Sequence, residues 1–309
     1  MNEILSLLIG IALLYLGGDA LVRGAASLAY RLGMSPLVVG LTVVAFGTSA
    51  PELVVSVSSA IEGQGDIAVG NVIGSNICNV GLILGVAALL TPMPIQSKIV
   101  KIDLPILLFV SGLAAYFLFD LTITRSEGIV LALGLLLFIA LTFYFAKGDP
   151  KALEGEPSVA PLAISKSLLF IGIGLTLLIF GGDIFVEAAV KIALTLGVSN
   201  AVIGLTVVAI GTSLPELATS IIAALKRESD IAVGNVVGSN IFNILCVLGL
   251  SATVSPLSMG SITWFDITVM SLFSLALLPL CRSGWILSRK EGAGLLLVFM
   301  GYLFWQFLK

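Results

Sequence analysis

Residues 47–56 read GTSAPELVVS, and residues 211–220 read GTSLPELATS. Each stretch places a proline and then a glutamate inside a run that is otherwise apolar. Proline lacks an N–H donor and clashes with the carbonyl four residues back, and glycine is a weak helix former. We therefore expect each helix to unwind across the five residues GTSxP, with a glutamate directly after the break.

The composition around these stretches is that of a membrane protein. Of the 309 residues, 58% are hydrophobic and 11% are charged, whereas soluble domains carry about 25% charged residues. An apolar run of about 20 residues spans a bilayer as a helix. The sequence therefore predicts an all-α integral membrane protein with about ten transmembrane helices, near residues 4–22, 36–60, 67–91, 103–119, 128–146, 166–186, 200–224, 231–254, 264–280 and 291–308.

Several classes of function are disfavoured by the residues that the chain lacks. It contains no histidine, which removes imidazole as a metal ligand, catalytic base or proton relay. Cys78, Cys246 and Cys281 are too widely spaced for a metal knuckle, and we expect them to be buried, unpaired thiols. No basic block of the kind that binds nucleic acid is present.

The chain is an internal duplication. At a shift of 164 residues, VVGLTVVAFGTSAPEL (38–53) matches VIGLTVVAIGTSLPEL (202–217), and DIAVGNVIGSNICN (66–79) matches DIAVGNVVGSNIFN (230–243). Roughly forty of about seventy-six aligned positions are identical, far more than shared composition explains. Because five helices per half is an odd number, the halves are expected to have inverted topology, which is typical of alternating-access transporters.

This repeat sets the expected domain boundaries and orientation. The first repeat is placed at 1–146 (core 17–92), a polar linker at 147–165, and the second repeat at 166–309 (core 181–256). Basic residues collect in cytoplasmic loops, and about twelve of the fifteen Lys and Arg flank one side. We therefore expect a multi-pass protein of the cytoplasmic membrane, with both termini outside and the linker in the cytoplasm.

A glutamate at membrane depth allows two interpretations. In the first, SAPE and SLPE are capping boxes, in which Ser49 or Ser213 caps the restarted helix and the glutamate reaches back to it. In the second, Glu52 and Glu216 bind an ion. A charge at mid-membrane costs about 3 kcal/mol, whereas a cap contributes only about 1 kcal/mol. Capping alone does not offset that cost, which favours the ion site.

The polar residues near both glutamates follow helical spacing. Residues four apart share one helix face, and four such stripes occur: Thr48, Glu52 and Ser56; Asn71, Ser75 and Asn79; Thr212, Glu216 and Ser220; Asn235, Ser239 and Asn243. An all-oxygen site with two carboxylates suits a hard cation such as Ca²⁺. One divalent ion, two monovalent ions or two protons can balance the two charges, which favours Ca²⁺ in exchange for Na⁺ or H⁺.

The doubled GTSxPE and GNxxGSN segments resemble the two internal repeats of the calcium/cation antiporter superfamily, which includes the sodium/calcium exchangers. The resemblance implies a Ca²⁺ site made by the carboxylates of Glu52 and Glu216 with the backbone carbonyls of Thr48 and Thr212. It also implies Na⁺ sites that use Ser49, Ser75 and the carbonyl of Ala209 on one side, and Ser213, Ser239 and the carbonyl of Ala45 on the other. Asn79 would flank the centre.

One position departs from that family pattern. Asn243 stands where the well-studied exchangers carry an aspartate, and an amide can coordinate Na⁺ but cannot take up a proton. The resemblance implies Ca²⁺/Na⁺ antiport by alternating access across the lipid bilayer, with no enzymatic activity and no cofactor. The alternatives are an antiporter that couples Ca²⁺ to H⁺ or involves K⁺ and, less favoured, a sodium-coupled solute symporter.

Overall fold

The computed structural model describes residues 3–146, 162–196, 209–260 and 262–308. Within these ranges the chain is almost entirely helical, as the sequence predicts. The first half contains α1 (Glu3–Leu32), α2 (Pro36–Val39), η1 (Gly40–Val44), α3 (Ala45–Thr48), α4 (Ala50–Ile61), α5 (Gly65–Cys78), η2 (Asn79–Leu84), α6 (Gly85–Leu90), η3 (Ile99–Asp103), α7 (Leu104–Phe117), η4 (Leu118–Asp120) and α8 (Arg125–Ala146).

Where the second half is described, its main helices follow the same order. It contains α9 (Ile164–Thr195), α11 (Ala209–Gly211), α12 (Leu214–Leu225), α13 (Ser229–Phe242), η6 (Asn243–Leu248), α14 (Gly249–Val254), α15 (Trp264–Arg282) and α16 (Arg289–Leu308). The η segments in the middle of helices are wider π-helical turns. Most of the expected linker lies outside the described residues, and its last two positions, 164 and 165, already belong to α9.

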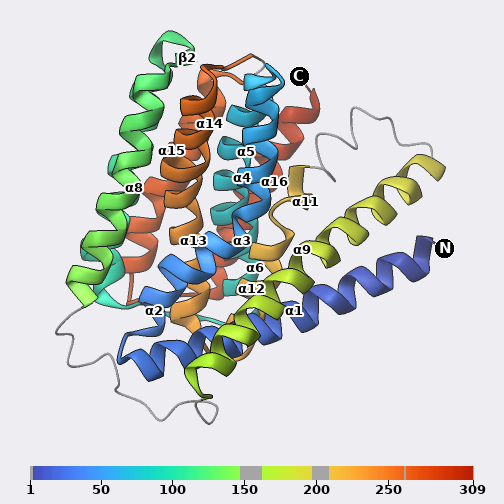
Figure 1. Cartoon of the computed structure of the whole chain (residues 1–309), viewed down its shortest axis with the longest axis vertical. Helices are drawn as coiled ribbons and strands as arrows, with labels where there is room; N and C mark the ends of the chain where they lie inside the picture. The colour runs from blue at the N-terminus through green and yellow to red at the C-terminus, as the bar shows by residue number, and fades with distance from the viewer. Residues whose placement is uncertain (1–2, 147–161, 197–208, 261, 309) are drawn as a thin grey trace.

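The helices α1 and α9 form a pair that runs diagonally across the rest of the bundle (Figure 1). Both are longer than the spans expected from hydropathy, with 30 and 32 residues. Their backbones touch at glycines: a Cβ on Gly17 would lie 2.9 Å from the carbonyl oxygen of Gly174, and a Cβ on Gly181 would lie 3.2 Å from that of Gly10. Small residues at such crossings allow the close helix packing that is common in membranes.

Two continuous segments form the centre of the bundle, α5–η2–α6 and α13–η6–α14. In the second, every residue of the apolar 18-residue window is buried, compared with 17% of the corresponding window in α8. The segment α13 packs against α2, η1 and α3 through Gly234 and Gly238. A Cβ on Gly238 would lie 2.7 Å from the carbonyl oxygen of Leu41, so the backbones of α13 and η1 are in close contact there.

The first GTSxP stretch breaks its helix, but over fewer residues than expected. The segment from Pro36 to Thr48 and the helix α4 meet at an angle of 45°, and Ser49 alone separates them. In the second stretch Thr212 and Ser213 separate α11 from α12. The expectation that all five residues unwind was wrong, because proline is well accommodated in the first turn of the restarted helix. Both prolines lie in that turn.

Within the described ranges, four two-residue strands are the exception to the all-α expectation. The strand β1 (Met93–Pro94) pairs antiparallel with β4 (Ile286–Leu287), and β2 (Thr122–Ile123) pairs antiparallel with β3 (Leu257–Ser258). A shift of 164 converts β1 into β3 and β2 into β4. Each pairing therefore joins one repeat to the other, and the two pairings are equivalent under the same shift that relates the sequences.

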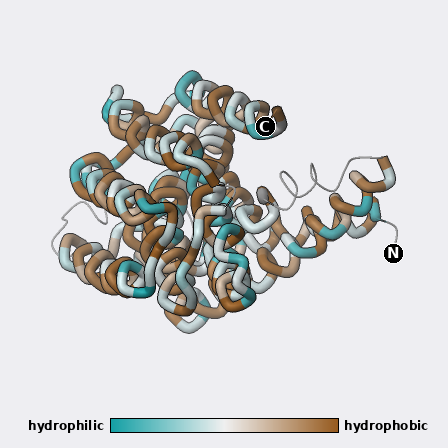
Figure 2. The backbone as a smooth tube through the Cα atoms, turned by 90° about the horizontal axis from the view of Figure 1, so that it is seen from above, coloured by the Kyte–Doolittle hydropathy of each residue, from teal (hydrophilic) through white to brown (hydrophobic). Residues whose placement is uncertain are grey.

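Many of the described helices are long and apolar enough to cross a membrane. Seven of them in the described residues pass as candidate spans, or eight if the bent pair around Ser49 is one span. Large apolar side chains also face outward, with Phe109, Tyr116 and Leu297 each more than 70% exposed. In Figure 2 hydrophobic residues cover the outer helices as well as the centre. A surface of this kind matches lipid rather than water.

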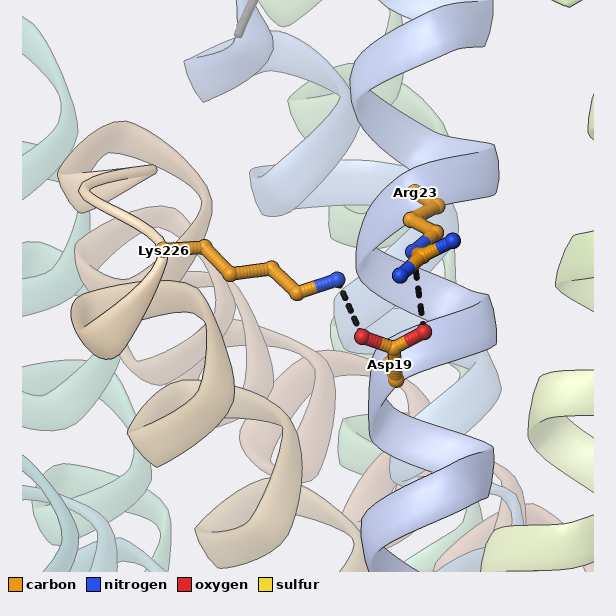
Figure 3. Close-up of polar contacts among 3 residues, drawn as sticks. All are labelled: Asp19, Arg23 and Lys226. Atoms are coloured by element: carbon orange, nitrogen blue, oxygen red, sulfur yellow. Dashed lines mark ion pairs between the residues drawn. The ribbon is translucent and has the colours of Figure 1, made fainter. Parts of the chain in front are cut away.

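An ion pair joins the diagonal helices to the bundle (Figure 3). One carboxylate oxygen of Asp19 on α1 contacts Nζ of Lys226 at the end of α12, and the other lies 2.9 Å from Nε of Arg23. The three side chains are partly exposed. Asp183, the equivalent of Asp19 in the second repeat, is exposed.

Candidate functional site

Each repeat donates a hydroxyl to the glutamate of the other repeat. The Oγ of Ser49 donates to Oε1 of Glu216 over 3.0 Å, and the Oγ of Ser213 donates to Oε1 of Glu52 over 3.4 Å. All four side chains are at most 3% exposed. The predicted proximity of the two glutamates at the repeat interface is therefore present, and it is built by a crosswise exchange of hydrogen bonds.

This geometry excludes the capping-box interpretation. Ser49 and Ser213 do occupy the N-cap positions of α4 and α12, but neither forms a side-chain cap hydrogen bond. Their hydroxyls cross to the other repeat instead. A buried carboxylate that accepts only one hydroxyl keeps most of its hydrogen-bonding capacity free. The two glutamates are therefore positioned for something other than the start of their own helices.

Two asparagines form hydrogen bonds with the helices that carry the glutamates. The Nδ2 of Asn71 on α5 donates to the backbone carbonyl of Glu52 over 3.3 Å and to Oγ of Ser56 over 2.9 Å. In the second repeat, Asn235 on α13 does the same to Glu216 and Ser220, over 3.4 and 3.0 Å. The polar stripes predicted from helical spacing thus face one another.

The same asparagines also connect the repeats. The Oγ1 of Thr48 donates to Oδ1 of Asn235 over 3.1 Å, and the Oγ1 of Thr212 donates to Oδ1 of Asn71 over 3.4 Å. The threonine hydroxyls therefore connect the repeats, whereas the resemblance implies that the backbone carbonyls of the same residues bind the ion. Thr48 is fully buried and Thr212 is partly buried.

Four further asparagines form a cluster where α5 passes into η2 and α13 passes into η6. We call Asn76, Asn79, Asn240 and Asn243 the amide quartet; each is at most 1% exposed. The Nδ2 of Asn79 donates to Oδ1 of Asn240, and the Nδ2 of Asn243 donates to Oδ1 of Asn76, each over 3.0 Å. The remaining amides donate to backbone carbonyls, Asn76 to Asn240 over 3.3 Å and Asn240 to Asn76 over 3.5 Å.

Several buried oxygens of the site have no hydrogen-bond partner. A buried polar atom without a partner costs about 1–3 kcal/mol, and such atoms are rare unless a ligand or water fills the gap. All of them belong to residues singled out from the sequence: Oε2 of Glu52, Oε2 of Glu216, Oγ of Ser239, Oδ1 of Asn79 and Oδ1 of Asn243. An all-oxygen set that includes two carboxylates is suited to a hard cation.

The remaining predicted ligands lie in or beside the same region. Ser75 is buried and accepts a hydrogen bond from Ser213 over 3.3 Å. Ala45 is buried at the start of α3, and Ala209 is the first residue of α11. Residues 197–208, which precede Ala209, lie outside the described residues.

The charge of the site is set by two carboxylates. Among the described residues no cluster of three or more acidic, histidine or cysteine side chains could hold a metal ion. The crosswise serine bonds place each carboxylate at the helix break of the opposite repeat, and like charges that lie close together repel one another. A dication between them would remove that repulsion, whereas a neutral ligand would not.

Asn76 and Asn240 have no role that is predicted from the sequence. Both belong to the GSN part of the repeated segment, and they lie three residues before Asn79 and Asn243. The feature of the sequence that marks these two asparagines is that the same residue occurs at the equivalent position of both repeats. The crosswise bonds could not be read from helical spacing, because they join residues about 160 positions apart.

Comparison with known proteins gives the family. A family model described as sodium/calcium exchanger protein matches residues 2–144 and 166–308. The chain belongs to the sodium/calcium exchanger protein family. The matched segments include both glutamates and the whole amide quartet. This membership confirms the resemblance found in the sequence. It also confirms the prediction that the chain is a multi-pass membrane protein that transports cations.

Individual relatives of this exchanger-family chain are similar along almost their whole length. The inner membrane protein YrbG of Escherichia coli is 38% identical, over 97% of this chain and 94% of that protein. The sodium/calcium exchanger MaX1 of Methanosarcina acetivorans is 36% identical, over 97% of both. A solved structure of the sodium-calcium exchanger NCX_Mj, soaked with zero Na⁺ and Ca²⁺, has a TM-score of 0.86 at 32% identity, over 97% of both chains.

Proposed function

We propose that this exchanger-family chain is a secondary antiporter that moves Ca²⁺ in one direction and Na⁺ in the other. The observation that supports this proposal is the set of five buried, unpartnered oxygens on two facing repeats, two of them carboxylate oxygens. A dication balances the two charges of Glu52 and Glu216, and two Na⁺ ions balance the same charges. Occupancy by one kind of ion therefore excludes the other, which is the physical basis of exchange.

The proposed ligands of Ca²⁺ are the carboxylates of Glu52 and Glu216 and the backbone carbonyls of Thr48 and Thr212. The proposed Na⁺ ligands are Ser49, Ser75, Ser213, Ser239 and the carbonyls of Ala45 and Ala209. Asn79 and Asn243 flank the centre, where their amide oxygens would face either transported ion. A set made only of neutral hydroxyl and carbonyl oxygens suits a monovalent ion, whereas the dication also needs the negative charge of the two carboxylates. Both ions are transported substrates and not resident cofactors.

The proposed architecture is ten transmembrane helices in two inverted repeats. The bonds between the repeats support it, because a shift of 164 converts the Ser49–Glu216 bond into the Ser213–Glu52 bond. A two-fold axis produces such reciprocal contacts, and an odd number of helices per repeat directs that axis along the membrane plane. We place the site at the bilayer midplane and both termini outside.

An antiporter that exchanges H⁺ for Ca²⁺ is the second candidate function. It is favoured by Asn243, because the site then has only two carboxylates and two protons would neutralise both. A third candidate, the sodium-coupled solute symporter, would need a cavity for an organic molecule beside the glutamates. The side chains there are almost completely buried, which disfavours it.

The test is uptake of ⁴⁵Ca²⁺ into proteoliposomes under imposed ion gradients. An outward Na⁺ gradient should drive uptake, while an outward H⁺ or K⁺ gradient alone should not. Uptake driven by H⁺ alone would replace the Na⁺ proposal by the second candidate. If none of the three gradients drives uptake in vesicles shown to contain folded protein, the antiport proposal fails.

A further inference from the structure

The amide quartet connects each repeat to the ion-facing asparagine of the other repeat. Asn76 of the first repeat accepts the side-chain amide of Asn243 in the second, and Asn240 of the second accepts that of Asn79 in the first. Asn79 and Asn243 each begin a π-helical turn, where the backbone is wider than in an α-helix and functional residues often occur.

The hydrogen bonds of the quartet fix which end of each amide points where. An amide has a donor end and an acceptor end. If Asn243 were turned by 180°, its oxygen would meet the oxygen of Asn76. If Asn76 were turned instead, its NH₂ group would meet that of Asn243 and its oxygen would meet the backbone carbonyl of Asn240. Each of these rotations breaks hydrogen bonds and brings two donors or two acceptors together. The orientation in which Asn76 accepts and Asn243 donates is therefore the stable one.

That arrangement leaves the oxygens of Asn79 and Asn243 without a partner. The NH₂ group of each is bonded within the quartet, and each Oδ1 is buried and unpaired. The turn η2 packs against α12, which carries Glu216, and η6 packs against α4, which carries Glu52. The free oxygens thus belong to the segments beside the two carboxylates. A cation is attracted by the oxygen end of an amide and repelled by its NH₂ end.

We propose that Asn76 and Asn240 are positioning residues for the ion site: each fixes the amide of the opposite repeat so that the oxygen of Asn243 or Asn79 faces the transported ion. This inference rests on the proposed function. It also gives a reason for an amide at position 243. The oxygen of Asn76 is an acceptor, so the residue that faces it has to donate, which an ionised aspartate cannot do.

Double-mutant cycles test this crosswise connection. The first cycle combines Asn76→Leu with Asn243→Ala, which are bonded across the repeats. The matched control cycle combines Asn76→Leu with Asn79→Ala, which lie on the same segment but are not bonded to each other. The readouts are the Ca²⁺ dissociation constant of the purified full-length protein, measured by calorimetry, and the half-saturating Ca²⁺ concentration and maximal rate of Na⁺-driven uptake.

We expect Asn76→Leu to weaken Ca²⁺ binding about tenfold, as the loss of a group that orients a metal ligand commonly does. The maximal rate should change much less than the half-saturating concentration. In the Asn243→Ala background the same substitution should change the dissociation constant less than about twofold, because its partner is already absent. In the Asn79→Ala background it should again cost about tenfold.

Additive effects in the first cycle, or unchanged Ca²⁺ binding by Asn76→Leu, would overturn the inference while leaving the proposed function intact. Wild-type protein that neither binds Ca²⁺ nor takes it up would overturn both. If the leucine variant does not fold, Asn76→Ser takes its place. A serine is too short to hold Asn243 in the same way, and the same two cycles are then compared.

Discussion

The hydroxyl of Ser49 lies 3.0 Å from Oε1 of Glu216, although 167 positions separate the two residues in the chain. The equivalent bond in the other direction joins Ser213 to Glu52. Each carboxylate is therefore held by the helix break of the opposite repeat. Movement of one repeat relative to the other would alter both bonds, and in the proposed antiport these bonds connect ion occupancy to the relative position of the repeats.

The two glutamates provide the first prediction. Glu52→Gln and Glu216→Gln should each abolish Ca²⁺ uptake, because each removes one of the two charges that compensate the dication. Both variants should still fold, since glutamine has nearly the same shape and can accept the same serine hydroxyl. Uptake of ⁴⁵Ca²⁺ and elution from size-exclusion chromatography measure the two effects.

The matched control is Glu62→Gln, which removes an exposed carboxylate just after the end of α4. It should transport at close to the wild-type rate. Near wild-type uptake by either Glu52→Gln or Glu216→Gln would show that the paired carboxylates do not bind the transported ion.

Ser49 gives a second prediction. Ser49→Ala should raise the Na⁺ concentration needed for half-maximal Ca²⁺ release about tenfold, because it removes both a proposed Na⁺ ligand and a donor that orients Glu216. Na⁺-driven efflux from loaded proteoliposomes measures this concentration. Ser58→Ala on the exposed side of α4 is the control and should behave as wild type. A Na⁺ dependence equal in both variants would remove Ser49 from the site.

A third prediction concerns pH. Carboxylate ligands bind Ca²⁺ only when they are ionised, so protons compete with the metal and each bound Ca²⁺ releases protons. Affinity should therefore be greatest at alkaline pH and should fall as the solution is acidified. Calorimetry in buffers with different ionisation enthalpies measures both the affinity and the released protons. A dissociation constant that does not change with acidification, without proton release, contradicts the paired-glutamate site.

Much of this site could be predicted from sequence because its chemistry is local and repeated. Proline after GTS marks a helix break, and a glutamate inside an apolar span is too costly to be accidental. The two glutamates, the serines beside them and the four polar stripes can therefore be identified without a structure. The exact shift of 164 residues also indicated that the two halves would face one another.

The connections between the halves could not be predicted in the same way. Helical spacing shows which residues share a face, but not which face of another helix they meet. The hydroxyl of Ser49 was expected either to cap its own helix or to bind Na⁺, and only the structure shows it bonded to Glu216. The extent of the break was also overestimated, since proline fits the first turn of the restarted helix.

The ion pair between Asp19 and Lys226 gives a fourth prediction. Lys226→Met should lower the thermal stability of the detergent-solubilised protein slightly, by about 0.5–1 kcal/mol in free energy of unfolding, as is usual for partly exposed pairs. The effect should decrease with added salt. Lys290→Met, at an exposed position at the start of α16, is the control. An equal loss in both variants, independent of salt, would mean that the pair does not hold α12 against α1.

Asn243 provides the last prediction. Asn243→Asp should add a third titratable group beside Glu52 and Glu216, and like charges that lie close together favour the binding of protons. An ionised aspartate would also place its carboxylate against the oxygen of Asn76, which now accepts the amide of Asn243. A protonated aspartate can donate to that oxygen, so the variant should hold a proton where the wild type has an amide.

The variant should therefore keep Na⁺-driven Ca²⁺ uptake, because the serine and carbonyl groups are unchanged, but its optimum should move toward higher pH. The alternative is that Asn243 only packs across the repeat interface, where such hydrogen bonds contribute about 0.6 kcal/mol on average. Stability would then change and the pH profile would not. Uptake against pH for wild type and variant in matched liposomes decides between the two, since superimposable profiles would remove Asn243 from the ion site.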